Sequence, residues 1–218
     1  MERIKTYDFP NGMRLLYIPT QSTNDISCIQ GFIPLGSIHE TPKIYGGAHV
    51  LEHMLFQGTT SFPSQSDVTA VADKIGAYIN AYTEYDLTSY FIKFNAGSNG
   101  NNIEDMLYLM FEILWHSLIH EEDFKREKKV VIEELIRAFE EPDEILNTIS
   151  YREWFKNTPM EHPIGAYMKN IENIGYNDIV KLYRTWYHPQ NTQLVVSTHI
   201  PFEKLIETIH SAFQRLPL

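Results

Sequence analysis

The chain has 218 residues, of which 43% are hydrophobic, and a formal net charge of −10. This length is enough for one large domain with a substantial core. The acidic balance argues against nucleic-acid binding, because a phosphate-binding face needs a basic patch. The single cysteine, Cys28, excludes an internal disulfide and lies in an apolar run typical of a buried strand. With neither a signal peptide nor an apolar run of the roughly 18–20 residues that span a membrane, we expect a cytoplasmic protein without membrane contacts.

The first part of the chain predicts three strands before the first helix. Residues 2–8 and 13–18 flank a Pro-Asn-Gly turn, whose Asn-Gly pair favours a tight hairpin. Residues 26–35 form a third apolar and β-branched run. We expect the helix that follows to start near residue 46 and to end near residue 58, because glycines stand at both places.

The rest of the chain predicts more helices than strands. Residues 95–102 and 157–165 have the composition of loops. Strands at both ends with helices between them indicate one α+β domain over residues 1–218, with a mostly antiparallel sheet of about six strands to which the last strand returns. The expected elements are a helix at 66–75, strands at 77–83 and 87–94, helices at 103–118, 121–139, 143–154 and 177–186, a strand at 193–200 and a helix at 201–214.

The first expected helix carries the spacing H-x-x-E-H in His49, Glu52 and His53. Positions i and i+4 lie one above the other on a helix, so the two imidazoles can hold one metal ion. Glu52 lies on the same side and can reach a water molecule on that ion. This is the inverted zinc-protease motif, although a match of three residues alone carries a false-positive risk.

The surroundings of the motif favour a metal site over a coincidence. The remaining helix positions, Val50, Leu51, Met54 and Leu55, are apolar, which predicts a largely buried helix. Buried histidine and glutamate side chains need partners, because an unpaired buried polar group is costly. A bound metal ion supplies such partners.

A catalytic zinc ion takes three protein ligands and keeps one open position, so one ligand remains to be found. The helix at 121–139 offers Glu127, Glu133 and Glu134. Glu127 and Glu134 are two turns apart on one face, whereas Glu133 points about 100° away from Glu134. Taken alone, a glutamate cluster of this kind is more often a solvated acidic face than a metal site.

Several motifs together give a specific resemblance that runs along essentially the whole chain. The chain resembles the M16 family of inverted zinc metallopeptidases, which includes pitrilysin, insulin-degrading enzyme and the mitochondrial processing peptidase. The resemblance implies the fold of an M16 peptidase half-domain, related to the LuxS-like metallohydrolases. The motifs are, in chain order, Gly36-Ser37-x-x-Glu40, Gly47-x-His49-x-x-Glu52-His53-Met-Leu-Phe-x-Gly58-Thr59, Asn80-Ala81-x-Thr83-x₆-Tyr90, Glu127-x₆-Glu134 and Tyr187-His-Pro-x-Asn191.

The resemblance implies a role for each residue of the site. His49, His53 and Glu134 correspond to the ligands of a Zn²⁺ ion. Glu52 corresponds to the general base that activates the zinc-bound water. Glu127 corresponds to an auxiliary acidic residue that supports the site without binding the metal.

The resemblance also implies a substrate and a way of holding it. The expected activity is that of a zinc-dependent endopeptidase acting on short or unstructured peptides. Asn80, Ala81, Tyr82 and Thr83 correspond to an edge strand that binds extended substrate through backbone pairing.

Family members close two homologous domains of about this size over the peptide, and the second domain supplies an Arg-Tyr pair. The chain corresponds to the first, zinc-binding domain, and nothing in it matches that pair. We therefore expect a heterodimer with a homologous chain that lacks zinc. A homodimer is the alternative, since twofold pairs are common.

Two other functions compete with the peptidase. A non-catalytic scaffold subunit, like the core proteins of respiratory complexes, would have lost zinc residues, but His49, Glu52, His53 and Glu134 are all present. A peptide-binding module with structural zinc would usually close its site with four ligands, often including cysteine. Cys28 is the only thiol, so this second alternative is disfavoured.

Overall fold

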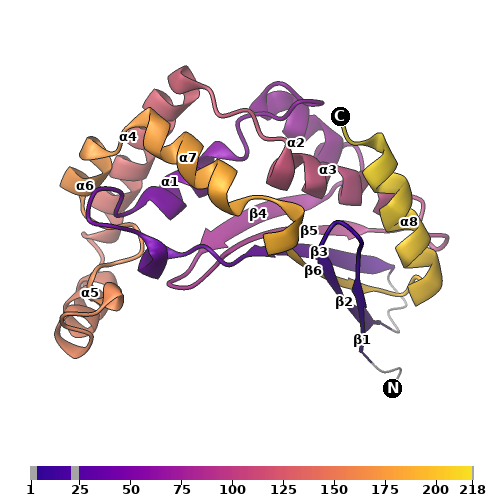
Figure 1. The fold of residues 1–218 in the computed structure, drawn as a ribbon, viewed down its shortest axis with the longest axis horizontal. Coiled ribbons are helices and arrows are strands. Elements are labelled where there is room, and N and C mark those ends of the chain that lie inside the picture. The colour runs from indigo at the N-terminus through magenta and orange to yellow at the C-terminus, as the bar shows by residue number, and fades with distance from the viewer. Residues whose placement is uncertain (1–3, 21–24, 218) are drawn as a thin grey trace.

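The computed structural model describes residues 4–20 and 25–217, in which six strands form one sheet (Figure 1). The strand order is β1-β2-β6-β3-β5-β4. The neighbours β2 and β6 are parallel, and the other neighbouring pairs are antiparallel. The strands are β1 (Lys5–Asp8), β2 (Arg14–Pro19), β3 (Ile26–Ile33), β4 (Tyr78–Thr83), β5 (Thr88–Asn95) and β6 (Gln193–Thr198).

The predicted α+β class and the mostly antiparallel six-stranded sheet are confirmed. The C-terminal strand β6 lies between β2 and β3, so it returns to the first sheet as expected. The predicted hairpin joins β1 and β2, and Gly12 in its turn has a φ of 90°, which glycine adopts readily. The strand β4 lies at an edge of the sheet, so within residues 4–20 and 25–217 one of its sides has no neighbouring strand.

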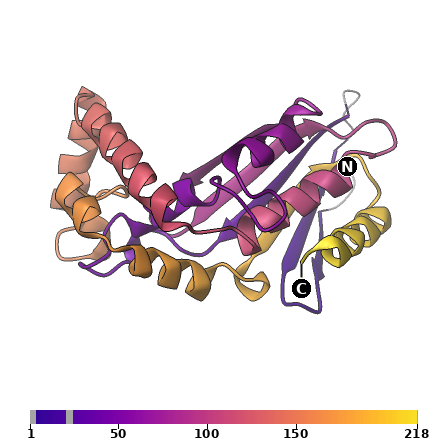
Figure 2. The ribbon, with the colours of Figure 1, turned by 90° about the horizontal axis from the view of Figure 1, so that it is seen from above.

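Eight α-helices accompany the sheet in the described residues. None of them is long and apolar enough to cross a membrane. Figures 1 and 2 show α4, α5 and α6 together at the end of the molecule opposite to α8. The helices are α1 (Gly47–Met54), α2 (Gln65–Asp73), α3 (Ile103–Trp115), α4 (Glu121–Ala138), α5 (Pro142–Trp154), α6 (Met168–Asn173), α7 (Tyr176–Trp186) and α8 (Phe202–Arg215).

The helix α3 packs closely on one face of the sheet. Side chains alternate between the two faces of a strand, and in β3 the residues Ile29 and Ile33 are fully buried beneath the helices. Between them lies Gly31, where an added Cβ atom would come within 2.7 Å of Leu114 Cδ1 on α3. Gly31 therefore allows α3 to approach β3 more closely than a larger residue would.

Two helices differ from the expectation at their ends. The first helix ends at Met54 rather than near residue 58, because the segment after it pairs elsewhere. Gly58 O accepts a hydrogen bond from Leu118 N, and Thr59 forms a β-bridge with Ser117. The second helix begins earlier than expected, because Ser64 rather than Ser66 caps it by accepting a hydrogen bond from Asp67 N.

The short helix α6 was not predicted. Its six residues have little amphipathic pattern of their own, so tertiary contacts determine its formation. Ile171 is fully buried. Lys128 Nζ on α4 donates hydrogen bonds of 2.9 Å to Glu172 O and to Ile174 O at the C-terminal end of α6. A positive charge at this end is favourable because it compensates the partial negative charge of the carbonyl groups.

The contact between Gly31 and α3 can be tested by substitution. Replacing Gly31 with valine should lower the free energy of unfolding by about 1–3 kcal/mol, because overfilling a packed core forces side chains or backbone to shift. Urea denaturation measures this change. Cys28→Val, on the other face of β3, is the control and should change stability by less than about 0.5 kcal/mol. Equal losses in the two variants would contradict the close packing.

Candidate metal centre

The helix α1 begins in an unusual way, which depends on Gly46. Gly46 precedes the helix with a φ of 86°, and a Cβ atom there would collide with Ile171 and lie 2.8 Å from Gly165 O. A side chain that could cap the helix at this position is therefore excluded. Glu40, in the preceding segment, caps the start of the helix instead. Its two carboxylate oxygens accept hydrogen bonds from Gly46 N (2.7 Å) and Ala48 N (2.6 Å). Burial raises the pKa of Glu40 to about 8, while the hydrogen bonds from Ala48 N and Gly46 N lower it in part. When Glu40 is ionised, its charge at the helix N-terminus is also electrostatically favourable.

The packing of α4 against α1 brings the acidic residues to the histidines. Phe124, Val131 and Leu135 are buried on one side of α4. Glu127 and Glu134 lie on the same side, because they follow the same helical spacing. The apolar contacts thus orient both carboxylates toward α1.

The structure places His49, His53 and Glu134 together. One ligand atom from each residue lies within 4.8 Å of the other two. His53 Nε2 is 3.3 Å from Glu134 Oε2, and His49 Nε2 is 3.9 Å from Glu134 Oε1. Donor atoms around a tetrahedral ion with bonds of 2.0–2.2 Å would be about 3.3–3.6 Å apart. Two imidazoles and a carboxylate at this spacing fit zinc, and they leave one position open.

The partly buried surroundings shift the pKa values of the ligands. Burial and the neighbouring His53 lower the pKa of His49 to about 4. Burial opposes the charge on His53, but the hydrogen bond to Glu134 and the nearby carboxylates of Glu52 and Glu127 outweigh it and raise its pKa. The hydrogen bond with His53 lowers the pKa of Glu134. At neutral pH the site therefore presents a neutral His49 and an ionised Glu134.

Glu127 faces His53 from the side opposite to Glu134. Its Oε2 atom is 3.7 Å from His53 Nδ1, and its side chain is only 9% exposed. Metal-binding histidines usually direct their second nitrogen at an acceptor such as a carboxylate, which fixes the ring. This placement suits the supporting role expected for Glu127, and the role itself stays a prediction.

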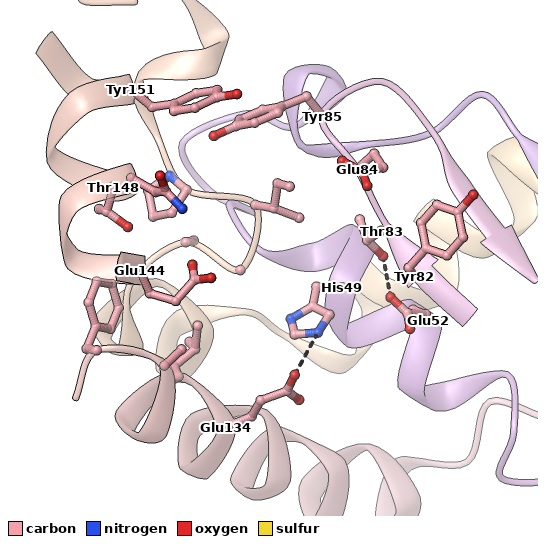
Figure 3. Close-up of a pocket in the computed structure, with 18 of the residues that line it drawn as sticks. His49, Glu52, Tyr82, Thr83, Glu84, Tyr85, Glu134, Glu144, Thr148 and Tyr151 are labelled. Carbon is pink, nitrogen blue, oxygen red and sulfur yellow. Dashed lines mark hydrogen bonds and ion pairs between the residues drawn. The ribbon is translucent and has the colours of Figure 1, made fainter. Parts of the chain in front are cut away.

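Glu52 is on α1, between His49 and His53, and it lies beside the group that these two residues form with Glu134. It is 9% exposed, and its Oε2 atom accepts a hydrogen bond of 2.6 Å from Thr83 Oγ1 at the end of β4 (Figure 3). Burial raises the pKa of Glu52, while the bond from Thr83 lowers it in part. A carboxylate with a raised pKa near a metal centre is suited to accept and release a proton near neutral pH.

The strand β4 presents backbone groups to its free edge. The hairpin to β5 closes with a hydrogen bond of 2.8 Å from Glu84 N to Leu87 O. Because hydrogen-bonded pairs alternate along an antiparallel ladder, the backbone groups of Ala81 and Thr83 point away from β5. In the free chain Asn80 Oδ1 accepts a hydrogen bond from Ala81 N. The predicted substrate strand is thus an edge strand beside the metal ligands.

Comparison with known proteins identifies the family. Residues 16–166 match the family described as insulinase, peptidase family M16. The chain belongs to peptidase family M16. The predicted resemblance is therefore confirmed, and the His49–His53–Glu134 cluster is a group of side chains that could hold the zinc ion of such a protein.

Curated relatives of this M16 chain include named zinc proteases. It is 30% identical over 197 residues to "Uncharacterized zinc protease YmxG" from Bacillus subtilis, covering 90% of this chain and 47% of that protein. It is 26% identical over 217 residues to mitochondrial-processing peptidase subunit beta from Neurospora crassa, covering 99% of this chain and 44% of that protein. The chain spans about half the length of the curated relatives that it matches.

Solved structures of similar fold include whole proteases that are longer than this M16 chain. A protease from Helicobacter pylori superposes with a TM-score of 0.88 at 24% identity, covering 99% of this chain and 51% of that chain. The periplasmic protease PqqL from Escherichia coli superposes with a TM-score of 0.90 at 23% identity, covering 100% of this chain and 24% of that chain. These likenesses support the fold.

Sequence reasoning missed one wall of the site. A cavity of about 570 Å³ extends from the ligands toward α5. Glu84 and Glu144 line it together with the stacked rings of Tyr85 and Tyr151, whose centroids are 5.2 Å apart (Figure 3). Residues from α5 could not be assigned to the site, because the helix has no buried side chain and little periodic pattern. With Glu52 and Glu134, the described residues that line the cavity include four carboxylates and no lysine or arginine.

The ligand assignment makes a prediction about zinc binding. Glu134→Gln should weaken zinc binding by more than about 100-fold, since even changes to groups that only support ligands cost about 10–100-fold. Glu133→Gln is the matched control, because Glu133 is exposed on the neighbouring position of α4. A zinc titration against a chelating dye measures both affinities. Equal affinities in the two variants would contradict Glu134 as a ligand.

The pKa shifts predict how zinc binding depends on pH. A histidine must be neutral to bind zinc, so a protonated His53 has to release its proton first. His53 has a pKa raised above 6.5, whereas that of His49 is lowered to about 4. Between about pH 5 and 6, the affinity should fall about tenfold for each unit of lowered pH, which corresponds to one displaced proton. A dependence of two protons in this range would contradict the neutral His49.

Proposed function

We propose that the chain is the zinc-binding part of an M16 endopeptidase that hydrolyses short or unstructured peptides. The observation that carries the proposal is the position of Glu52, which lies beside the His49–His53–Glu134 cluster and close to the free edge of β4. The names of the curated relatives support protease activity.

Zinc in this site would polarise the peptide carbonyl and lower the pKa of water to about 7. The residues of the chain would transfer the proton and hold the metal. Glu52 takes a proton from the attacking water as its oxygen bonds to the carbonyl carbon. The carbon–nitrogen bond breaks, and Glu52 passes the proton to the leaving amine. His49, His53 and Glu134 would hold the metal and so keep it at a fixed position relative to Glu52.

The substrate would bind as an added strand at the edge of β4. The backbone groups of Ala81 and Thr83 that point to the free edge offer the hydrogen bonds for such pairing. Asn80 would release Ala81 N to the peptide. This mode needs extended peptide backbone, which is why unstructured substrates are favoured over folded ones.

A second homologous domain would complete the enzyme. The chain spans about half the length of its curated relatives, and one of them is named as a subunit of a processing peptidase. The predicted zinc-less partner chain, in a heterodimer, fits both facts, and a homodimer remains the alternative. The non-catalytic scaffold is disfavoured, because the three residues proposed as metal ligands lie together and the proposed base, Glu52, is present beside them.

The proposal is tested by removing the base while keeping the metal. Glu52→Gln should lower kcat on a quenched unstructured peptide by about 10²–10⁴-fold, because general acid–base catalysis contributes that much. The zinc content should not change, because Glu52 is outside the ligand cluster. The assay is run on the chain alone and with a candidate partner. Activity that survives in Glu52→Gln, or a wild-type chain that binds no zinc, would overturn the proposal.

A further inference from the structure

The hydroxyl of Thr83 is the hydrogen-bond donor that reaches Glu52 in the described part of the chain. Thr83 Oγ1 lies 2.6 Å from Glu52 Oε2, a short distance typical of a bond to an ionised carboxylate (Figure 3). The two residues are 31 positions apart, so the contact joins the strand β4 to the helix α1. No second donor to Glu52 occurs among residues 4–20 and 25–217.

The position of Thr83 in the sheet fixes the direction of its side chain. It is the last residue of β4 and pairs with Thr88 of β5, next to the closed turn of the hairpin. Thr88 is fully buried, and its hydroxyl donates a hydrogen bond of 2.8 Å to Leu35 O. A β-branched side chain has few χ1 rotamers, so the Thr83 hydroxyl has a restricted set of directions. The donor is therefore held by the sheet before any substrate arrives.

The side chain of Glu52 needs such an anchor. The helix fixes its backbone, but three side-chain torsions remain between the backbone and the carboxylate. A general base acts only within hydrogen-bond reach of the proton it takes, at about 2.6–3.2 Å. Thr83 occupies one lone pair of Oε2, whereas Oε1 accepts no hydrogen bond in the described part of the chain, so Oε1 is the freer oxygen to face the attacking water.

We propose that Thr83 is a positioning residue, which holds Glu52 through Oε2 and directs Oε1 to the reacting water. The inference rests on the proposed peptidase function. Thr83 then has two separate roles in the predicted substrate strand. Its backbone faces the free edge, where a peptide would pair, and its hydroxyl donates a hydrogen bond to Glu52. Asn80 differs, since its side chain is exposed and contacts Tyr78 Oη at 2.9 Å.

Kinetics of two Thr83 variants separate positioning from substrate binding. Valine has nearly the shape of threonine without the hydroxyl, so Thr83→Val should lower kcat by about 10–100-fold and change KM by less than about twofold. Thr83→Ser keeps the donor and should recover most of kcat. Thr208→Val, which removes a hydroxyl from α8 at the other end of the molecule, is the control without effect. A raised KM with unchanged kcat would show a substrate contact instead and overturn the proposal.

A second measurement does not depend on peptide cleavage. In urea unfolding of the metal-free protein, Thr83→Val should lower the transition midpoint in the wild-type background but not in a Glu52→Ala background. The same shift in both backgrounds would mean that Thr83 stabilises the fold without holding Glu52, and would overturn the proposal. If the wild-type chain cleaves no peptide, the proposed function fails, and the unfolding cycle still decides whether Thr83 holds the carboxylate.

Discussion

The packing of α4 against α1 is the constraint on which the metal centre depends. The helix α1 can supply two imidazoles by its own geometry, but it has no means of supplying the third ligand. Burial of Val131 and Leu135 aligns α4 so that Glu134 reaches both histidines and Glu127 faces the second one. The positions of the charged residues in the site therefore depend on packing between apolar side chains that take no part in the chemistry.

The side chains of the metal site favour binding of a cation more than they favour the stability of the metal-free protein. Glu52, Glu127 and Glu134 bring three carboxylates around two histidines in a partly buried place. Like charges at short distance repel, and a buried polar group without a partner is costly. His49 Nδ1 is buried and has no hydrogen-bond partner in the described part of the chain. A bound Zn²⁺ ion would compensate the repulsion among the carboxylates, which links metal binding to folding.

The edge of the sheet connects the site to the rest of the fold. A free strand edge invites pairing with another chain, which natural proteins usually prevent. In this chain the edge of β4 lies beside the metal ligands, and Asn80 covers one of its N–H groups. At the end of this strand Thr83 donates a hydrogen bond to Glu52. The edge strand proposed to bind the peptide is thus in direct contact with the proposed general base.

The sequence by itself determined the order of the strands, the order of every helix except α6, and the chemistry of α1. His49, Glu52 and His53 could be read because helical spacing acts over four residues, and Glu134 could be carried over from the family motif. Only the tertiary structure decided the end of α1, the formation of α6, and the contacts of Glu52 with Thr83 and of Glu40 with the start of α1. The reason is physical: these features depend on neighbours that are distant in the sequence or outside a regular element, where no periodic pattern records them.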